Sequence, residues 1–200
     1  MSKKAVVYIH GKGGSADEAR HYEPFFKDRD VIGFDYKSLT PGDAKDEFAS
    51  FFDGLYKKYD GVTLIANSIG AFFSMSALSG HPIEKAFFIS PVVDMEKLIR
   101  DIMAFSNVTE DELREKREIP TPFGETLSWD YLSYVRENPI VWTVPTEILY
   151  GENDNLVYYE TISDFAGKVG AGLTVMKGGE HWFHTDEQMA FLDNWLKNRI

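Results

Sequence analysis

The chain has 200 residues, of which 44% are hydrophobic and 26% charged, a composition typical of one ordinary globular domain. Its formal net charge of −11 argues against nucleic-acid binding, which needs Lys and Arg to replace phosphate counterions, and against adhesion to anionic membranes. The chain contains no cysteine, which excludes disulfides, thiolate metal sites and cysteine nucleophiles.

The first predicted element is a buried strand at residues 5–9, an apolar run that ends at His10 and Gly11. This run is too short for the core of a signal peptide and has no cleavage site after it. No later stretch approaches the roughly 18 consecutive apolar residues that a membrane-spanning helix needs. We therefore expect a soluble, cytoplasmic protein.

Strand and helix patterns then alternate to the end of the chain. Short apolar runs predict further buried strands at residues 31–36, 61–66, 85–90, 146–150 and 173–176. Helical patterns occupy about residues 15–28, 42–58, 69–79, 156–169 and 185–198. This alternation predicts an α/β fold with a mostly parallel sheet of about six strands, covered by helices on both faces.

One region breaks the alternation. No strand is predicted between residues 94 and 144, where residues 95–118 have a charged helical pattern and an aromatic cluster follows a Pro- and Gly-containing break. This region is too short and too polar to own a core. We therefore expect residues 1–200 to form a single domain, with residues 94–144 inserted as a helical lid over the carboxyl edge of the sheet.

A serine stands at the junction of a predicted strand and a predicted helix. Ser68 follows the strand at residues 61–66 and precedes the helix at residues 69–79. A sharp turn at such a junction lifts the serine hydroxyl above the sheet, as in a nucleophile elbow. A serine hydroxyl is a poor nucleophile unless a neighbouring base removes its proton and a third group orients that base.

Later loops supply residues of both kinds. Asp154 lies in a loop after the strand at residues 146–150, and His181 lies in a loop after the strand at residues 173–176. Both loops leave the carboxyl ends of strands, where open parallel sheets gather their ligands. The first strand ends in the glycine-rich turn 10–14, whose free N–H groups can stabilise an oxyanion.

In this order, the glycine turn, the elbow serine, the acid loop and the histidine loop resemble those of the α/β-hydrolases, and the resemblance covers nearly the whole chain. It implies that Ser68 is the nucleophile, His181 the base and Asp154 the acid. It also implies that the N–H groups of Lys12 and Ile69 form the oxyanion hole.

The chain departs from the family pattern in two places. Ala66 stands two residues before the serine, where the family usually has glycine. The family's two leading antiparallel strands have no counterpart before the strand at residues 5–9, which leaves a reduced sheet.

The resemblance implies a carboxylesterase-like or thioesterase-like serine hydrolase that acts on a small soluble substrate through an acyl-enzyme on Ser68. The alternatives are an amide or carbon–carbon bond hydrolase with the same triad, or a non-catalytic scaffold that binds a ligand or partner. Dehalogenase and epoxide hydrolase are disfavoured, because relatives with those activities would place aspartate at position 68. The motifs do not indicate an oligomeric state.

Other residues are secondary candidates for the site. Candidate substrate contacts are His10, Gly11, Asn67, Trp129 and Trp182. For Trp129, anchoring of the insertion on the main body is an equally good explanation.

The acid and the histidine have rivals in the sequence. Glu152 and Asp94 are alternative acids, and His184 is an alternative to His181. We expect no metal and no other cofactor, because the H-E-x-x-H signature and a carboxylate cluster are both missing.

Overall fold

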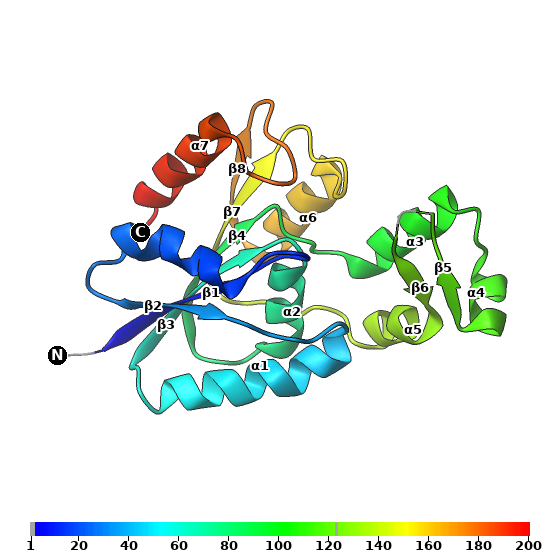
Figure 1. The fold of residues 1–200 in the computed structure, drawn as a ribbon, viewed down its shortest axis with the longest axis horizontal. Helices are drawn as coiled ribbons and strands as arrows, with labels where there is room; N and C mark the ends of the chain where they lie inside the picture. Colours follow the sequence, from blue (N-terminus) through cyan, green and yellow to red (C-terminus); the bar gives the residue numbers. More distant parts are fainter. Residues whose placement is uncertain (1–2, 123) are drawn as a thin grey trace.

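The computed structural model describes residues 3–122 and 124–200, and its main feature is a six-stranded sheet with helices on both faces (Figure 1). The strands are β1 (Lys4–Ile9), β2 (Asp30–Phe34), β3 (Gly61–Asn67), β4 (Ile83–Ile89), β7 (Thr146–Gly151) and β8 (Gly172–Met176). They lie in the order β2-β1-β3-β4-β7-β8, and every neighbouring pair is parallel. The predicted α/β class and the predicted strands are confirmed.

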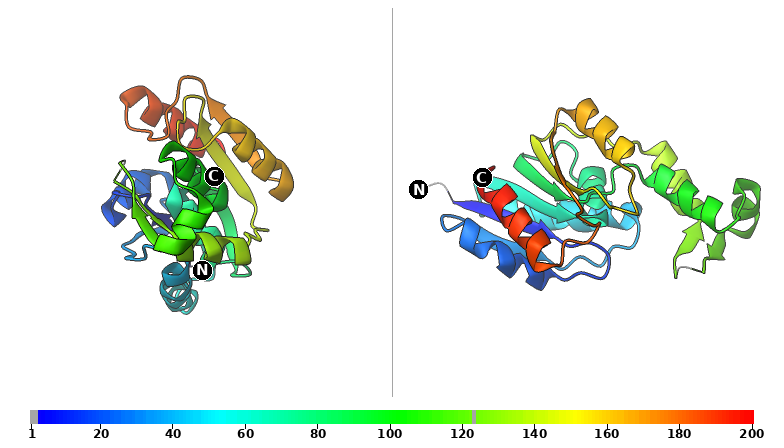
Figure 2. Two further views of the ribbon diagram at one scale, coloured as in Figure 1. Left: turned by 90° about the vertical axis from the view of Figure 1, so that its right-hand side faces the viewer. Right: turned by 90° about the horizontal axis from the view of Figure 1, so that it is seen from above.

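Helices cover the two faces of this sheet (Figure 2). The larger core contains buried residues of α1 (Pro41–Tyr56), α2 (Ile69–Ala77) and α6 (Tyr159–Val169). The smaller core contains buried residues of η1 (Ala16–Phe25) and α7 (Asp186–Lys197). The first predicted helix is a run of 3₁₀ turns rather than an α-helix, and Pro24, which has no amide donor, lies inside it.

Alternate residues of the central strands face the two cores. On β3, Leu64 packs in the larger core and Ile65 in the smaller one, and neither side chain is exposed. On β1, Val7 and Tyr8 are divided in the same way. Because a parallel strand is buried on both faces, it is encoded as a continuous apolar run, which explains why the sequence located these strands.

Residues 94–144, called the inserted segment below, connect β4 to β7 and project to one side of the main body in Figure 1. The segment contains α3 (Met95–Phe105), α4 (Glu110–Lys116), β5 (Glu118–Pro120), β6 (Thr126–Ser128) and α5 (Trp129–Glu137). The prediction of no strand here is wrong, because β5 and β6 pair as a short antiparallel hairpin. Each of these strands has three residues, too few to give a recognisable alternation of apolar and polar side chains.

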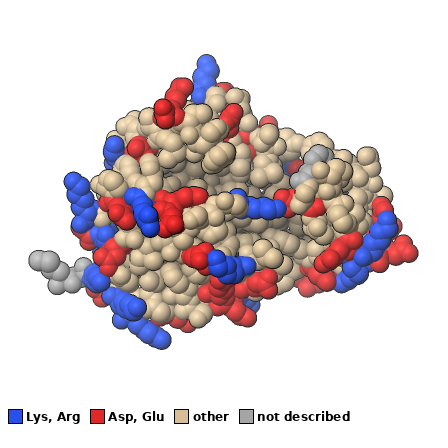
Figure 3. Space-filling model, in the orientation of Figure 1, with Lys and Arg blue, Asp and Glu red and all other residues tan. Residues whose placement is uncertain are grey.

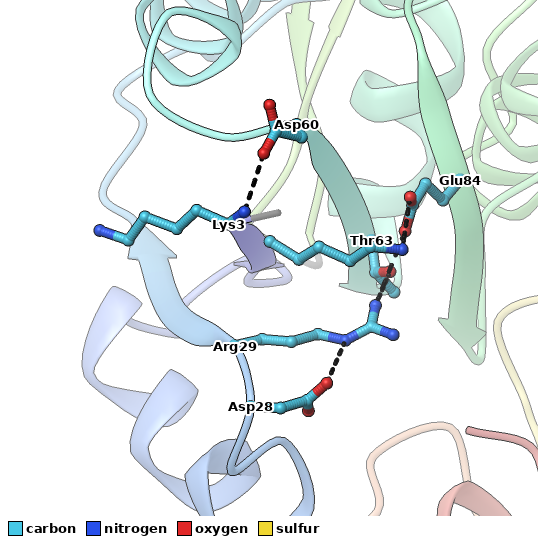
Figure 4. A network of polar contacts seen from close by, with 7 residues as sticks. Lys3, Asp28, Arg29, Asp60, Thr63 and Glu84 are labelled. Atoms are coloured by element: carbon cyan, nitrogen blue, oxygen red, sulfur yellow. Dashed lines mark hydrogen bonds and ion pairs between the residues drawn. The ribbon is translucent and has the colours of Figure 1, made fainter. Parts of the chain in front are cut away.

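A polar network joins the amino ends of the strands, at the opposite edge from Ser68 (Figure 4). The Arg29 guanidinium donates to Thr63 Oγ1 at 3.0 Å and lies 3.8 Å from the Glu84 carboxylate. Lys4 Nζ donates to Glu84 at 2.8 Å. These contacts tie β1, β3 and β4 to the chain that enters β2, so this edge contributes to stability.

Charge on the rest of the surface is mixed. In the face shown in Figure 3, acidic and basic side chains lie next to one another rather than in a stripe of one sign. Among the described residues, no helix has the length and apolar character needed to cross a membrane.

The contact of β2 with η1 leaves no room for a side chain at Gly33. A Cβ atom at this position would lie 1.9 Å from the main-chain oxygen of Ala16 and 2.7 Å from its carbonyl carbon. Because both atoms belong to the backbone, a larger residue would have to push η1 away from the sheet.

We therefore expect Gly33→Ala to lower the free energy of unfolding by about 1–3 kcal/mol, the usual cost of overpacking. Gly54→Ala is the matched control, because Gly54 lies in α1 and no described atom beyond its chain neighbours and its own helix backbone comes within 4 Å of its Cβ position. The free energy of unfolding of the Gly54→Ala protein should rise by about 0.5–1 kcal/mol, because alanine is the better helix former. Urea unfolding followed by circular dichroism tests both, and equal effects would contradict the packing argument.

Candidate active site

Ser68 forms a strained turn between β3 and α2. Its φ of 49° and ψ of −120° are rare for a residue other than glycine. Its N–H donates to the Ile89 carbonyl at 3.0 Å, and its own carbonyl accepts from Ala71 and Val92 at 3.1 Å each. These bonds hold the turn against a backbone strain of about 1–3 kcal/mol.

The first turn of α2 passes close to the end of β1, which requires glycine at position 70. A Cβ atom on Gly70 would lie 2.4 Å from the His10 carbonyl oxygen and 2.8 Å from that of Ile9. Ala66 is fully buried within β3, where it pairs with Ile9 of β1 and Phe88 of β4. The α/β-hydrolase sequence pattern usually has glycine at this position. In this chain the turn closes with the alanine methyl group buried in the core.

Three side chains from three loops form one hydrogen-bonded chain. Ser68 Oγ lies 2.9 Å from His181 Nε2, and His181 Nδ1 lies 2.7 Å from Asp154 Oδ2. With the Nδ1 hydrogen donated to the carboxylate, Nε2 is the nitrogen that can accept the serine proton. This arrangement provides a nucleophile, a base and an orienting group in contact.

The Asp154 side chain is fully buried but not isolated. Its Oδ1 accepts hydrogen bonds from the N–H groups of Leu156 at 2.8 Å and Val157 at 3.0 Å, while Oδ2 faces His181. These donors compensate for the loss of water around the carboxylate and fix its orientation.

The acid loop and the histidine loop are bound to each other through their backbones. The Glu152 N–H donates to the Met176 carbonyl at 3.0 Å, and the Asn153 N–H donates to the Gly179 carbonyl at 2.7 Å. A Cβ atom on Gly151 would lie 2.6 Å from the Gly179 carbonyl oxygen, so only glycine allows this approach. The distance between Asp154 and His181 is therefore set by backbone contacts.

The rival residues from the sequence make other contacts. The Glu152 carboxylate accepts from the Gly178 N–H at 2.9 Å, and the Asp94 carboxylate caps α3 by accepting from the Lys97 N–H at 2.9 Å. His184 Nδ1 lies 2.7 Å from a main-chain carbonyl of its own loop. Among the contacts of the described residues, neither alternative acid bonds to His181 and His184 does not bond to Ser68.

Two N–H groups lie free near the serine. Ile69 begins α2, where the first backbone N–H groups have no partner within the helix. The glycine turn approaches from the other side, because a Cβ atom on Gly11 would lie 3.2 Å from Ser68 Cβ. Within residues 3–122 and 124–200, the N–H groups of Lys12 and Ile69 donate to no protein acceptor. This pair could receive the oxygen of a carbonyl under attack.

Ser68 opens into a cavity of about 470 Å³. Its lining comprises Gly11, Lys12, Gly13, Gly14, Glu18, Asn67, Ser68, Ile89, Leu156, His181, Trp182 and Phe183. Three of the candidate substrate contacts line this cavity, namely Gly11, Asn67 and Trp182. Trp182 is 71% exposed at the mouth.

Two candidate contacts are not brought to this cavity. The His10 ring stacks on Tyr36, with ring centroids 4.4 Å apart. Trp129 lies in the inserted segment, where the Arg114 guanidinium is 4.9 Å from the centre of its ring. This contact of Trp129 is therefore with another residue of the inserted segment.

Sequence reasoning did not single out Glu18, Leu156 or Phe183, which also line the cavity. Glu18 belongs to a capping box with Ser15, and this S-x-x-E pattern was the signal that could have placed it at the start of η1. Among the described residues, no group of three or more His, Asp or Glu side chains is placed to hold a metal ion.

Comparisons with known proteins agree with this architecture. The structure is similar to Est1E from Butyrivibrio proteoclasticus, with a TM-score of 0.74 and 19% identity over 98% of this chain and 86% of that chain. It is also similar to mouse alpha/beta hydrolase domain-containing protein 10, with a TM-score of 0.71 and 18% identity over 97% of this chain and 88% of that one. A marine microorganism esterase gives a TM-score of 0.61 and 16% identity, covering 98% and 95% of the two chains.

A curated Mycoplasma genitalium protein, whose name contains "esterase/lipase 3", is 27% identical over 103 residues. The match covers 45% of this chain and 37% of that protein, so the chain spans only about a third of its length. No family model matches the chain. The structural likenesses establish that the chain has the α/β-hydrolase fold.

The strain at Ser68 leads to a prediction about stability. Ser68→Gly should be more stable than Ser68→Ala by about 1 kcal/mol, because glycine relieves about 1–3 kcal/mol of backbone strain and gives back part of it in chain entropy. Both substitutions remove the hydroxyl, so the comparison isolates the backbone. Urea unfolding of the two variants measures the difference, and a Ser68→Ala protein of equal or greater stability would show that the turn is not strained.

Proposed function

We propose that this protein of the α/β-hydrolase fold is a serine hydrolase that cleaves the carboxylic ester or thioester of a small substrate. The supporting observation is the hydrogen-bonded chain from Ser68 through His181 to Asp154, with distances of 2.9 and 2.7 Å, at the edge of a cavity. The strained backbone at Ser68 also supports the proposal, because such strain persists where the surrounding structure holds a functional residue in place.

In the first half of the proposed reaction, Ser68 Oγ attacks the carbonyl carbon while His181 Nε2 takes its proton. Asp154 holds the imidazole by Nδ1 and stabilises its positive charge. The N–H groups of Lys12 and Ile69 bind the oxyanion that forms. His181 then gives the proton to the leaving alcohol or thiol, and an acyl-enzyme on Ser68 remains.

In the second half, water takes the place of the leaving group. His181 removes a proton from this water as it attacks the acyl carbon, and the oxyanion donors act again. The tetrahedral intermediate collapses, Ser68 Oγ recovers its proton from His181, and the carboxylic acid is released.

We also propose that residues 1–200 are one domain in which the inserted segment acts as a lid. The Lys12 side chain in the glycine turn pairs with Glu125 of the inserted segment at 2.5 Å, which joins the segment to one wall of the cavity beside Ser68. The two side chains are 67% and 44% exposed, and such exposed pairs contribute about 1 kcal/mol or less. Opening of the lid would therefore cost little at this contact.

Hydrolysis of p-nitrophenyl esters and acyl-CoA thioesters of graded length tests the catalytic assignment. Ser68→Ala should lower kcat by about 10⁶-fold and Asp154→Asn by about 10⁴-fold on whichever ester is cleaved. Ser76→Ala is the matched control, because Ser76 lies on the same helix, α2, outside the cavity lining. Full activity of Ser68→Ala on an ester that the protein cleaves would end the proposal.

The lid is tested by a covalent clamp. The chain has no native cysteine, so Lys12→Cys/Glu125→Cys carries two thiols, which a short bismaleimide can bridge. The bridged protein should lose kcat/KM several-fold more for long-chain esters than for acetyl esters, since only the long ones need the mouth to open. The same variant treated with N-ethylmaleimide is the control. Equal kcat/KM values for bridged and control protein at every chain length would mean that the segment does not move as a lid.

A further inference from the structure

The cavity beside Ser68 carries one carboxylate without a counterion. Besides His181, its charged lining residues are Lys12 and Glu18. The Lys12 ammonium is already neutralised by Glu125 at 2.5 Å. Within the described part of the chain, Glu18 forms no ion pair with Lys, Arg or His. With Lys12 paired to Glu125, the unpaired charge that a substrate meets in this cavity is that of Glu18, and it is negative.

Glu18 is held by two donors that leave it able to accept more hydrogen bonds. Its Oε1 accepts from the Ser15 N–H at 3.0 Å, and its Oε2 accepts from the Tyr8 hydroxyl. Each carboxylate oxygen has two lone pairs, so each keeps one acceptor site. A Cβ atom on Gly14 would lie 2.9 Å from Oε1. The absence of a side chain at Gly14 therefore leaves room for the Glu18 carboxylate.

The same network reaches the residue before the nucleophile. Asn67 Nδ2 donates to the Tyr8 hydroxyl at 3.0 Å, so Glu18, Tyr8 and Asn67 form one chain that ends next to Ser68. Burial is the main cause that raises the pKa of Tyr8 far above its usual value, so its hydroxyl remains a donor to Glu18. Asn67 Oδ1 is buried and has no hydrogen-bond partner among the described residues.

Glu18 thus lines the cavity with a carboxylate that its two protein donors leave able to accept further hydrogen bonds. A hydrogen bond to a charged group contributes about 1.5–3 kcal/mol, so a ligand that brings N–H donors to this carboxylate gains affinity. A protonated amine offers three N–H donors and a positive charge, which matches a carboxylate. The net charge of −11 would further raise the local concentration of a cationic substrate.

We propose that Glu18 determines specificity by binding a protonated amino group of the substrate, so that the preferred substrates are esters whose acyl part carries an ammonium group near the scissile carbonyl. This inference rests on the proposed function, because it assigns a substrate class to the same site. Glu18 binds the ammonium group through charge-assisted hydrogen bonds, and Ser68 attacks the carbonyl beside it. An ester with an anionic group in this place is repelled.

The test compares two esters with the same leaving group, alanine p-nitrophenyl ester and p-nitrophenyl isobutyrate, in which a methyl group replaces the ammonium group. The measured quantity is the ratio of their kcat/KM values, each corrected for its hydroxide-catalysed rate. Glu18→Gln should lower this ratio about 10- to 100-fold, the value of a charge-assisted hydrogen bond. Glu23→Gln is the matched control, because it removes the same charge from a position of the same element, η1, outside the cavity lining.

The ratio separates recognition from a structural role. If Glu18 only caps η1, its removal lowers both kcat/KM values equally and leaves the ratio unchanged, which would overturn the inference. An equal fall of the ratio in Glu23→Gln would also overturn it, since the effect would then be one of overall charge.

A binding measurement keeps this test independent of catalysis. Ser68→Ala protein is titrated in a calorimeter with alaninamide and with isobutyramide, which are matched amides with and without the ammonium group. Tighter binding of alaninamide that disappears in Ser68→Ala/Glu18→Gln supports the inference even if no ester is hydrolysed, in which case only the proposed function fails. Equal binding of the two amides by Ser68→Ala protein would overturn the inference.

Discussion

The left-handed turn at Ser68 is the constraint around which the site is arranged. Hydrogen bonds from β4 and from the chain that follows it hold this turn, because Ser68 bonds to both Ile89 and Val92. The turn brings the first N–H of α2 beside the hydroxyl, and it needs Gly70 to pass under the end of β1. Since β3 lies between β1 and β4, the glycine turn approaches from one side and the acid and histidine loops from the other.

Rigid and loose contacts are separated around the serine. Asp154 is buried and bonded to two N–H groups besides His181, and the loops that carry these residues are joined by backbone hydrogen bonds. By contrast, the inserted segment meets the glycine turn through Lys12 and Glu125, both well exposed. This separation is what the proposed reaction would need, with the reacting atoms fixed and a looser contact where substrate would enter.

The sequence predicted those parts of the structure that are encoded locally. Buried parallel strands are continuous apolar runs, and the functional loops follow them directly, so the sequence pattern was enough to place Ser68, Asp154 and His181 at one edge of the sheet. Features that depend on tertiary packing were not predicted. The hairpin of β5 and β6 has no pattern of its own, and Trp129 was misplaced because an aromatic cluster does not reveal which neighbours it packs against. Glu18 lies far from Ser68 in the sequence and reaches the site only through the fold of η1 over β1.

The central claim is that the contact of His181 with Ser68 makes this one serine nucleophilic. The most direct measurement is labelling of the folded protein with a fluorophosphonate, followed by peptide mass spectrometry. The account predicts a single adduct on the peptide that contains Ser68 and little or none in His181→Ala protein, whose fold is checked by circular dichroism. An adduct on another residue, or no adduct on folded protein, would contradict the account and favour a scaffold that binds without catalysis.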